Sequence, residues 1–219
     1  MESLEPFDRF PPPAELVERA IQHPDDVLGE LFDRAHTAYW HLLTFRMDRR
    51  LMARVDAEDV LQEAYLATLK RISAWTREPK SSLFLWTRLT VLQTLIDVHR
   101  RHVGTDMRSA SREVPLGAQT AVRTTAACLA DCLSAGITSP SGVAIREESQ
   151  AELQAAIESL GELDQEIIAL RSFEGLSNAQ AAEVLGLSVT AASNRYVRAL
   201  ERLQTALPGP IDKARDVQP

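Results

Sequence analysis

The apolar residues of this chain recur at three- and four-residue spacing along most of its length, which is the pattern of amphipathic helices. Alternating runs of β-branched and aromatic residues between turns, which would indicate strands, are missing. The pattern predicts helices over 14–22, 26–45, 56–73, 81–102, 151–160 and 164–173, followed by a helical pair that begins near Ser177. The predicted fold class is therefore all-α.

Each N-terminal helix has one apolar face that we expect to be buried. In 26–45 this face consists of Val27, Leu28, Leu31, Phe32, Ala35, Tyr39, Leu42 and Leu43. In 56–73, with Asp56 as the expected N-cap, it consists of Val60, Leu61, Tyr65, Leu66 and Leu69. In 81–102 it is predicted to consist of Leu85, Leu89, Leu92 and Ile96, opposite a polar face of Thr90, Gln93, Thr94, Asp97, Arg100 and Arg101.

Residues 104–146 are rich in Ser, Thr, Ala and Gly, and their apolar residues follow no regular spacing. We therefore predict a long linker with a marginal helix near 124–133. The predicted organisation is two small helical domains on either side of this linker. In chain order the segments are an N-terminal arm 1–25, a helical domain 26–103, the linker 104–146, a second helical domain 147–207 and a tail 208–219.

The second domain contains the pattern of a helix-turn-helix. Ser177 and Gln180 have the spacing of a capping box, and Gly186 permits a tight left-handed turn before Ser188 caps the next helix. In that last helix we expect Ala192, Tyr196, Leu200 and Leu203 to face inward, and Thr190, Ala191, Ser193, Asn194, Arg195, Arg198 and Arg202 to face outward. The outward residues near its N-terminus are where a recognition helix reads base edges, whereas Arg198 and Arg202 suit phosphates. A helical hairpin in which the glycine serves packing alone is the alternative.

Charge and composition narrow the class of protein. The 219 residues carry a net charge of −7, and residues 35–110 form the basic part of the chain, so tight DNA binding would need a partner. The sequence has no apolar stretch of about 18 residues that could span a membrane and no secretion signal at its start, and we expect a cytoplasmic protein. The sequence contains no phosphate-cradling loop, no nucleophile elbow and no histidines or cysteines at metal-ligand spacing. We therefore expect that the protein is not an enzyme and that it has no catalytic residue, no cofactor and no metal site.

Three segments resemble parts of one protein family. The run Asp56-Ala57-Glu58-Asp59-Val60-Leu61-Gln62-Glu63-Ala64-Tyr65 is similar to a segment of bacterial RNA polymerase sigma factors of the extracytoplasmic-function type. The stretch from Phe84-Leu85-Trp86 to Leu95-Ile96-Asp97-Val98-His99-Arg100-Arg101 resembles the next part of the same domain. Residues 160–203, with the helix-turn-helix, are similar to the fourth region of that family. The three segments follow in the family's order.

This resemblance implies roles for individual residues. It assigns core polymerase binding to Asp56, Glu58, Asp59, Gln62 and Glu63, although Asp56 is better explained as stabilising the helix N-terminus. It assigns promoter DNA contacts to Gln93, Asp97, Arg100 and Arg101, and capture of a flipped base to the loop near Pro79–Ser82. It places Thr190, Ser193, Asn194, Arg195 and Arg198 against duplex DNA. Trp75 and Trp86 could stack on bases, but core packing is the simpler interpretation.

The expected function is that of a dissociable initiation subunit, which binds core RNA polymerase and directs promoter recognition and melting. Its partners would be core polymerase, promoter DNA and an anti-sigma factor, with no membrane partner. One alternative is a stand-alone helix-turn-helix regulator that binds an operator as a symmetric dimer. A second alternative is a helical adaptor without a DNA role, for which replacing Arg195 would have no effect.

Overall fold

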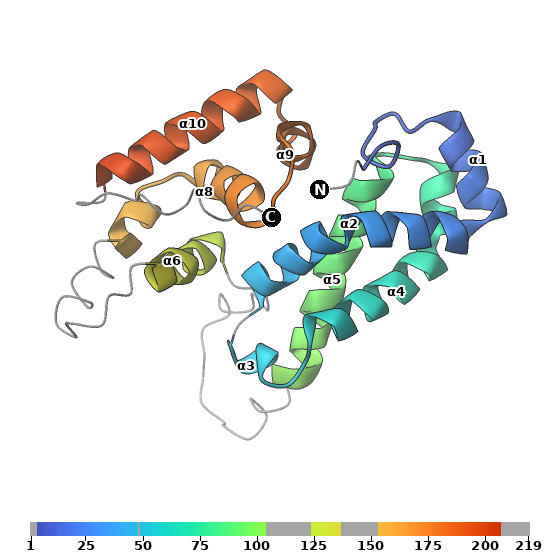
Figure 1. Ribbon diagram of the computed structural model, residues 1–219, viewed down its shortest axis with the longest axis horizontal. Helices are drawn as coiled ribbons and strands as arrows, with labels where there is room; N and C mark the ends of the chain where they lie inside the picture. Colours follow the sequence, from blue (N-terminus) through green and yellow to red (C-terminus); the bar gives the residue numbers. More distant parts are fainter. Residues whose placement is uncertain (1–3, 48, 104–123, 137–152, 207–219) are drawn as a thin grey trace. The chain divides into compact units, whose positions relative to one another are not determined.

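The computed structural model describes residues 4–47, 49–103, 124–136 and 153–206, and all regular secondary structure in these ranges is helical (Figure 1). The chain divides into two compact units, residues 1–123 and residues 124–219. Both findings confirm the predicted all-α fold with two helical domains. The first unit contains α1 (Ala14–Gln22), α2 (Pro24–Arg46), α3 (Arg49–Met52), α4 (Ala57–Arg77) and α5 (Leu83–Val103).

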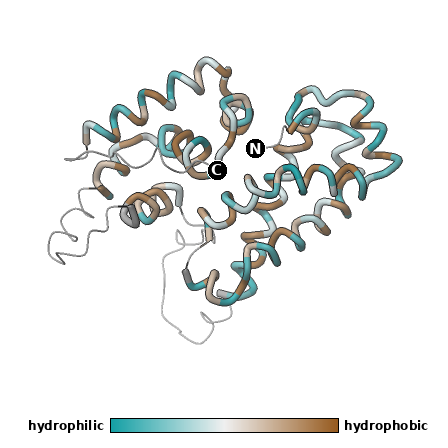
Figure 2. The backbone as a smooth tube through the Cα atoms, in the orientation of Figure 1, coloured by the Kyte–Doolittle hydropathy of each residue, from teal (hydrophilic) through white to brown (hydrophobic). Residues whose placement is uncertain are grey.

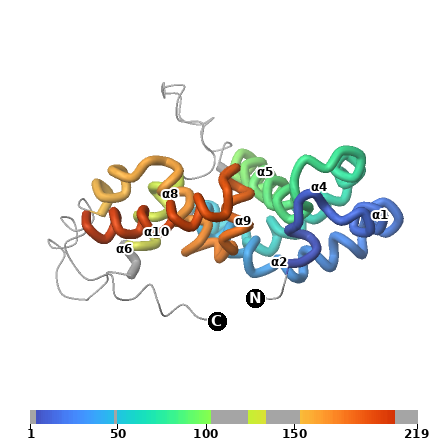
Figure 3. The backbone as a smooth tube through the Cα atoms, turned by 90° about the horizontal axis from the view of Figure 1, so that it is seen from above, coloured from blue at the N-terminus to red at the C-terminus, as the bar shows by residue number. Residues whose placement is uncertain are grey.

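Three long helices, α2, α4 and α5, form the core of the first unit and lie side by side in both Figure 1 and Figure 3. The apolar face predicted for α2 is buried except for Phe32, which is half-buried. On α4 the residues Val60, Leu61, Ala64, Ile72 and Trp75 are buried. Leu66, which was predicted to face inward, is 54% exposed. Thr68 is buried instead, and its hydroxyl donates to the carbonyl of Ala64 at 2.7 Å.

Tyr39 joins α2 to α5 at the centre of this core. Its ring stacks on that of Phe84 with centroids 5.7 Å apart, and its hydroxyl bonds to the Thr87 hydroxyl. Thr87 in turn donates to carbonyl oxygens of the preceding turn of α5. Because the tyrosine is fully buried and its polar end is satisfied, the contact fixes the register of two helices that lie 48 residues apart in sequence.

This burial predicts an alkaline limit to the stability of the first unit. Burial raises the pKa of Tyr39 far above its ordinary value of 10.0, an effect only partly offset by its hydrogen bond with Thr87 and by the positive charge of Arg88. The unfolded chain loses this proton near pH 10 and the folded chain retains it, so the free energy of unfolding should fall above about pH 10 by about 1.4 kcal/mol per pH unit. Urea unfolding followed by tryptophan fluorescence measures this. Tyr39→Phe should show a shallower decline, and parallel curves for the two proteins would contradict the prediction.

The predicted N-terminal arm packs within the first unit rather than apart from it. Phe7 is fully buried, and its carbonyl accepts a hydrogen bond from the backbone N–H of Phe84 at 2.9 Å. Arg34 of α2 donates to the carbonyl of Glu5 at 2.9 Å and lies over the Phe7 ring. Leu16 and Ala20 of α1 are buried as well. The arm therefore covers one end of the helical core.

The buried face of α5 differs from the predicted one, and this expectation was wrong. Leu89 is 53% exposed, and Leu85, Leu92 and Ile96 are only half-buried. The residues that enter the core are Leu83, Phe84, Thr87, Arg88, Thr90, Val91, Thr94, Leu95 and Val98. Threonines can occupy this face because each hydroxyl donates to a carbonyl one turn back, as Thr94 does to Thr90 at 2.9 Å. A hydropathy pattern treats these threonines as polar and therefore places the core on the wrong side of the helix.

The second unit contains α6 (Thr125–Gly136), a helical segment at 153–158, α8 (Glu162–Ile168), a π-helical turn η2 (Ala169–Phe173), α9 (Asn178–Leu185) and α10 (Val189–Ala206). Hydrophobic and hydrophilic positions alternate along α10 in Figure 2, as expected for a helix with one packed face. That face contains Ala192, Ala199 and Leu203. Leu200 was predicted to face inward but is 36% exposed, whereas its neighbour Ala199 is fully buried.

The marginal helix expected inside the linker is present as α6, and it packs on α8. Cys128 and Leu129 are buried in this contact, and the Thr125 hydroxyl donates to the Glu166 carboxylate at 2.6 Å. Residues 125–136 thus belong to the second unit. The rest of the predicted linker, 104–123 and 137–146, and the predicted tail 208–219 lie outside the described residues.

Candidate nucleic-acid interface

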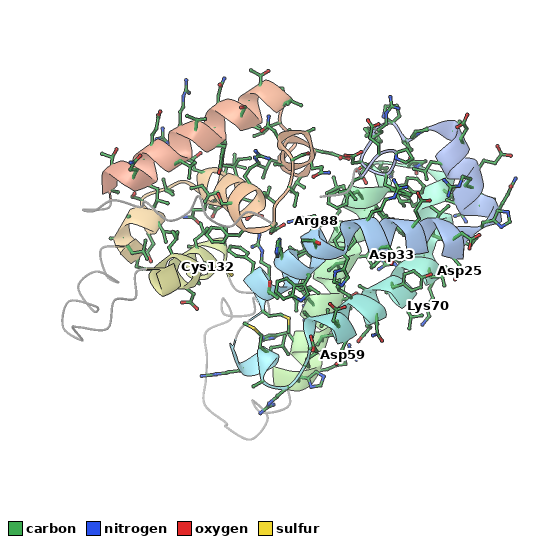
Figure 4. The ribbon with its side chains drawn as sticks, in the orientation of Figure 1. Asp25, Asp33, Asp59, Lys70, Arg88 and Cys132 are labelled. Atoms are coloured by element: carbon green, nitrogen blue, oxygen red, sulfur yellow. The ribbon has the colours of Figure 1, made fainter. Side chains whose placement is uncertain are left out.

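The N-terminus of α4 positions the acidic residues expected to bind a partner. Asp56 is the N-cap, and its carboxylate accepts a hydrogen bond from the backbone N–H of Glu58 at 3.2 Å, which confirms the predicted capping role. Glu58 accepts hydrogen bonds from His36 Nε2 of α2 at 2.9 and 3.2 Å. Asp59 and Gln62 are exposed one turn apart, and Asp59 lies at the surface near the start of α4 (Figure 4). These last two side chains are therefore accessible to a partner.

The polar residues expected to meet DNA lie on the last three turns of α5. Gln93, Asp97 and Arg100 are exposed or nearly so, and Gln93 Nε2 donates to Asp97 Oδ1 at 3.1 Å. Arg101 donates to the Glu63 carboxylate of α4, and this hydrogen bond raises the pKa of the Arg101 guanidinium. Glu63 and Arg101 were predicted to bind different partners, whereas the structure pairs them with each other. Both side chains remain about half exposed.

The loop between α4 and α5 is tied to the core by a tryptophan. Trp75 is 2% exposed, and its indole N–H donates to the carbonyl of Ser81 at 3.1 Å. Ser82 is buried and its hydroxyl accepts a hydrogen bond from the backbone N–H of Leu85, as an N-cap of α5 would. The core-packing interpretation is confirmed for Trp75, while Trp86 is half-buried. The loop expected to capture a base thus rests on a fixed support.

The helix-turn-helix in the second unit has the predicted local geometry. Gln180 N–H donates to the Ser177 hydroxyl at 3.2 Å, and Ser177 N–H donates to the Gln180 side chain at 2.8 Å, which completes the capping box. Gly186 ends α9 in the left-handed region with φ 63°. Ser188 then accepts from the Ala191 N–H at 3.2 Å and so caps α10. Ala182, a small residue of α9, is buried.

The turn gives a direct test of this geometry. A Cβ atom at Gly186 would meet nothing within 4 Å, so a side chain there costs only backbone strain. We expect Gly186→Val to lower the free energy of unfolding of the second unit by about 1–3 kcal/mol, because a β-branched residue rarely adopts positive φ. Gly186→Asn should cost clearly less, since asparagine tolerates this conformation. Hydrogen exchange of α9 amides measures the difference, and equal protection in the two variants would contradict it.

On α10, the residues predicted to face outward are exposed except for Arg195, which is half-buried. Thr190, Ser193, Asn194 and Arg198 are exposed as expected. Arg195 is turned toward α8 instead, where its Nη1 donates to Asp164 Oδ1 at 2.6 Å, and its side chain is 37% exposed. Tyr196 packs beside Arg171, whose guanidinium lies 5.5 Å from the ring centre, and its hydroxyl bonds to Ser172 at 3.0 Å.

Sequence reasoning missed Asp164, a residue that is 4% exposed and engages two arginines of α10. Its second oxygen accepts from Arg202 Nη1 at 2.7 Å. The partners lie 31 and 38 residues away in sequence, so no local pattern could reveal the cluster. An acidic residue in the first turn of a helix is expected for its interaction with the helix dipole alone, which gave Asp164 no distinguishing signal.

The described residues show neither a metal site nor a membrane-spanning helix. No group of three or more His, Cys, Asp or Glu side chains in the described part of the chain is arranged to hold a metal ion. Among the same residues, no helix is both long and apolar enough to cross a membrane. The two cysteines, Cys128 and Cys132, both lie on α6, and Cys128 is buried.

The second unit matches a known family model, and the chain as a whole is similar to two known proteins. Residues 150–203 match the family described as sigma-70, region 4, and this range contains α8, α9 and most of α10. The chain is 27% identical over 194 residues to the ECF RNA polymerase sigma factor BldN of Streptomyces coelicolor, covering 89% of this chain and 65% of that protein. It is 26% identical over 198 residues to the RNA polymerase sigma-H factor of Pseudomonas aeruginosa, covering 85% of this chain and 95% of that protein.

Among solved structures, the sigma factor RpoE of Bartonella quintana, in complex with the anti-sigma factor NepR, overlaps with a TM-score of 0.38 at 17% identity, over 83% of this chain and 96% of that chain. All three sequence matches are to sigma factors. One is confined to the fourth region, and two extend over both units. The chain is therefore similar to RNA polymerase sigma factors over both units, and to sigma-70 region 4 over residues 150–203.

Proposed function

We propose that this chain binds core RNA polymerase and directs promoter recognition and melting at the start of transcription. The observation that carries the proposal is the helix-turn-helix, whose capped α10 presents Thr190, Ser193 and Asn194 from its first two turns. Side chains at this end of a recognition helix reach base edges in the major groove. The second unit would hold the distal promoter element as duplex in this way.

The first unit would hold the polymerase and the proximal promoter element. The exposed Asp59 and Gln62 of α4 can pair with basic and amide groups across an interface. Arg100 on the exposed surface of α5 can meet phosphates, and Gln93 and Asp97 can contact an unpaired base. Extruding a base from the duplex costs a few kcal/mol. The loop beside Trp75 is already held by the hydrogen bond from the indole to the Ser81 carbonyl, so binding the base need not also order this loop.

The distribution of charge supports a division of labour with the polymerase. The chain is acidic overall at −7, and the predicted DNA contacts lie on two separate units. Few phosphate contacts per unit give weak binding at physiological salt. We therefore assign most of the DNA affinity to the assembled holoenzyme, with this chain as a specificity subunit and no catalytic role of its own. An anti-sigma factor, the further partner implied by the sequence resemblance, would act by competing with polymerase.

Run-off transcription tests the proposal. Purified core polymerase, with and without this chain, is given a library of genomic fragments, and transcripts of defined length are expected only when the chain is present. A stand-alone regulator would instead bind an operator tightly as a dimer without polymerase. A helical adaptor would give neither result, and absence of chain-dependent transcripts together with absence of core binding would refute the proposal.

A further inference from the structure

A buried carboxylate lies beneath two surface arginines of the recognition helix. Asp164, in the first turn of α8, is 4% exposed and uses both of its oxygens, Oδ1 on Arg195 and Oδ2 on Arg202, at 2.6 and 2.7 Å. The arginine side chains are 37% and 65% exposed. The guanidinium groups thus lie at the surface while their common anchor lies below it.

Each arginine keeps donors beyond the one given to Asp164. The recorded bond to the carboxylate uses only Nη1 of each guanidinium, which has five N–H groups in a rigid planar fork. Together with Asn194 and Arg198, the two arginines and Asp164 line a surface pocket of about 300 Å³. Three guanidinium groups and a single carboxylate leave this pocket with a net positive charge of two, so it favours an anion.

The guanidinium groups of Arg195 and Arg202 lie side by side. The two residues are seven positions apart on α10, about 10 Å along the helix axis, but their Nη1 atoms converge on the two oxygens of one carboxylate at 2.6 and 2.7 Å. The pair therefore presents one cationic surface that a backbone phosphate can bind. Arg198 lies between them on the same face of α10.

We propose that Asp164 is a positioning residue for promoter binding: it holds Arg195 and Arg202 so that the remaining edges of their guanidinium groups bind backbone phosphates. The inference rests on the proposed function and extends it, because it assigns a role to a residue that is too buried to act as a principal DNA contact itself. It also gives Arg195 a phosphate role in place of the base contact expected from its sequence position.

Lysine substitutions separate this role from simple charge. Lysine keeps the positive charge but concentrates its donors at one ammonium, which cannot bind a carboxylate and a phosphate on opposite edges as the guanidinium fork does. We expect Arg202→Lys to weaken holoenzyme binding to a promoter fragment about tenfold and to reduce the salt dependence of binding by about one phosphate contact. Arg198→Lys is the comparison: Arg198 lines the same pocket but is not anchored by Asp164, so this variant should weaken promoter binding clearly less than Arg202→Lys does.

For Asp164→Asn, a positioning role and a purely electrostatic role predict changes in promoter affinity of opposite sign. Removing a negative charge near DNA would raise affinity if charge alone mattered, whereas loss of positioning should lower it. The measurement is fluorescence anisotropy across a salt series, with affinity for core polymerase and the thermal midpoint of each full-length variant measured in parallel. Unchanged core affinity with weakened promoter binding supports the proposal. Arg202→Lys that behaves like Arg198→Lys, or tighter binding by Asp164→Asn, overturns it.

Two additional measurements keep the test decisive. Asp164→Asn could melt below the assay temperature. In that case the double variant Arg195→Lys, Arg202→Lys takes its place in the promoter-binding measurement, because both lysines keep the positive charge and the surface position of the arginines. If wild-type chain fails to bind core polymerase, the proposed function fails separately, and the same variants are compared on a short random-sequence duplex in low salt. Equal salt dependence of wild type and Arg202→Lys on that duplex would also refute the positioning role.

Discussion

Replacing Asp59 by lysine is expected to lower the affinity of the chain for core RNA polymerase by about ten- to a hundredfold, which corresponds to about 1.4–2.8 kcal/mol. Asp59 is exposed near the start of α4, where its carboxylate can meet a basic group of the polymerase (Figure 4). The substitution replaces that attraction by repulsion between like charges. Within the chain the loss should be small, since an exposed acid in the first helical turn contributes about 0.3–1 kcal/mol through the helix dipole.

Asp33→Lys is the matched control for this prediction. It makes the same change of charge on the exposed side of α2 in the same unit, and it should alter core affinity much less (Figure 4). Affinity is measured by titrating labelled core polymerase at two salt concentrations, because an electrostatic contact weakens as salt rises. If Asp59→Lys and Asp33→Lys have equal effects, the exposed part of α4 is not the polymerase-binding face.

The second large effect concerns stability. Trp75→Ala is expected to lower the free energy of unfolding of the first unit by about 3–5 kcal/mol, the usual loss for a fully buried tryptophan. The substitution leaves a cavity between α4 and its neighbours and removes the hydrogen bond to the Ser81 carbonyl. A small domain of marginal stability loses a large part of its free energy of unfolding in this way, so promoter melting should fail as well.

The three tryptophans make this measurement specific. Trp40, Trp75 and Trp86 all lie in the first unit, so tryptophan fluorescence reports unfolding of this unit without interference from the second. Trp86→Ala, which removes a half-buried ring, should cost clearly less and serves as the control. If Trp75→Ala costs no more than Trp86→Ala, then Trp75 does not anchor the loop, and a base-stacking role for it becomes the better explanation.

The ion pair between Glu63 and Arg101 affects the interpretation of binding measurements on variants of either residue. Both side chains are about half exposed, so the pair itself adds little to stability. However, a variant of Glu63 intended to test polymerase binding also removes the partner of Arg101, and the reverse holds for a variant of Arg101. Asp59 and Arg100 give cleaner tests of the two proposed surfaces for this reason.

The sequence by itself determined the features that depend on neighbours within a few residues. The helix caps at Asp56, Ser177 and Ser188 were predicted correctly because a cap joins a side chain to a backbone N–H two or three residues later. The left-handed turn at Gly186 follows from the same local rules. The family resemblance also rested on short runs whose order along the chain was sufficient.

Only the tertiary structure decided which face of α5 is buried and where Arg195 points. Thr87, Thr90 and Thr94 enter the core because their hydroxyls are satisfied by their own helix, a possibility that hydropathy alone does not register. Arg195 leaves the predicted outward face because a carboxylate 31 residues earlier in the chain lies within reach. Helix formation and capping are local, whereas the choice of face and of ion-pair partner depends on which helices pack together, and a single sequence does not encode that packing in any local pattern.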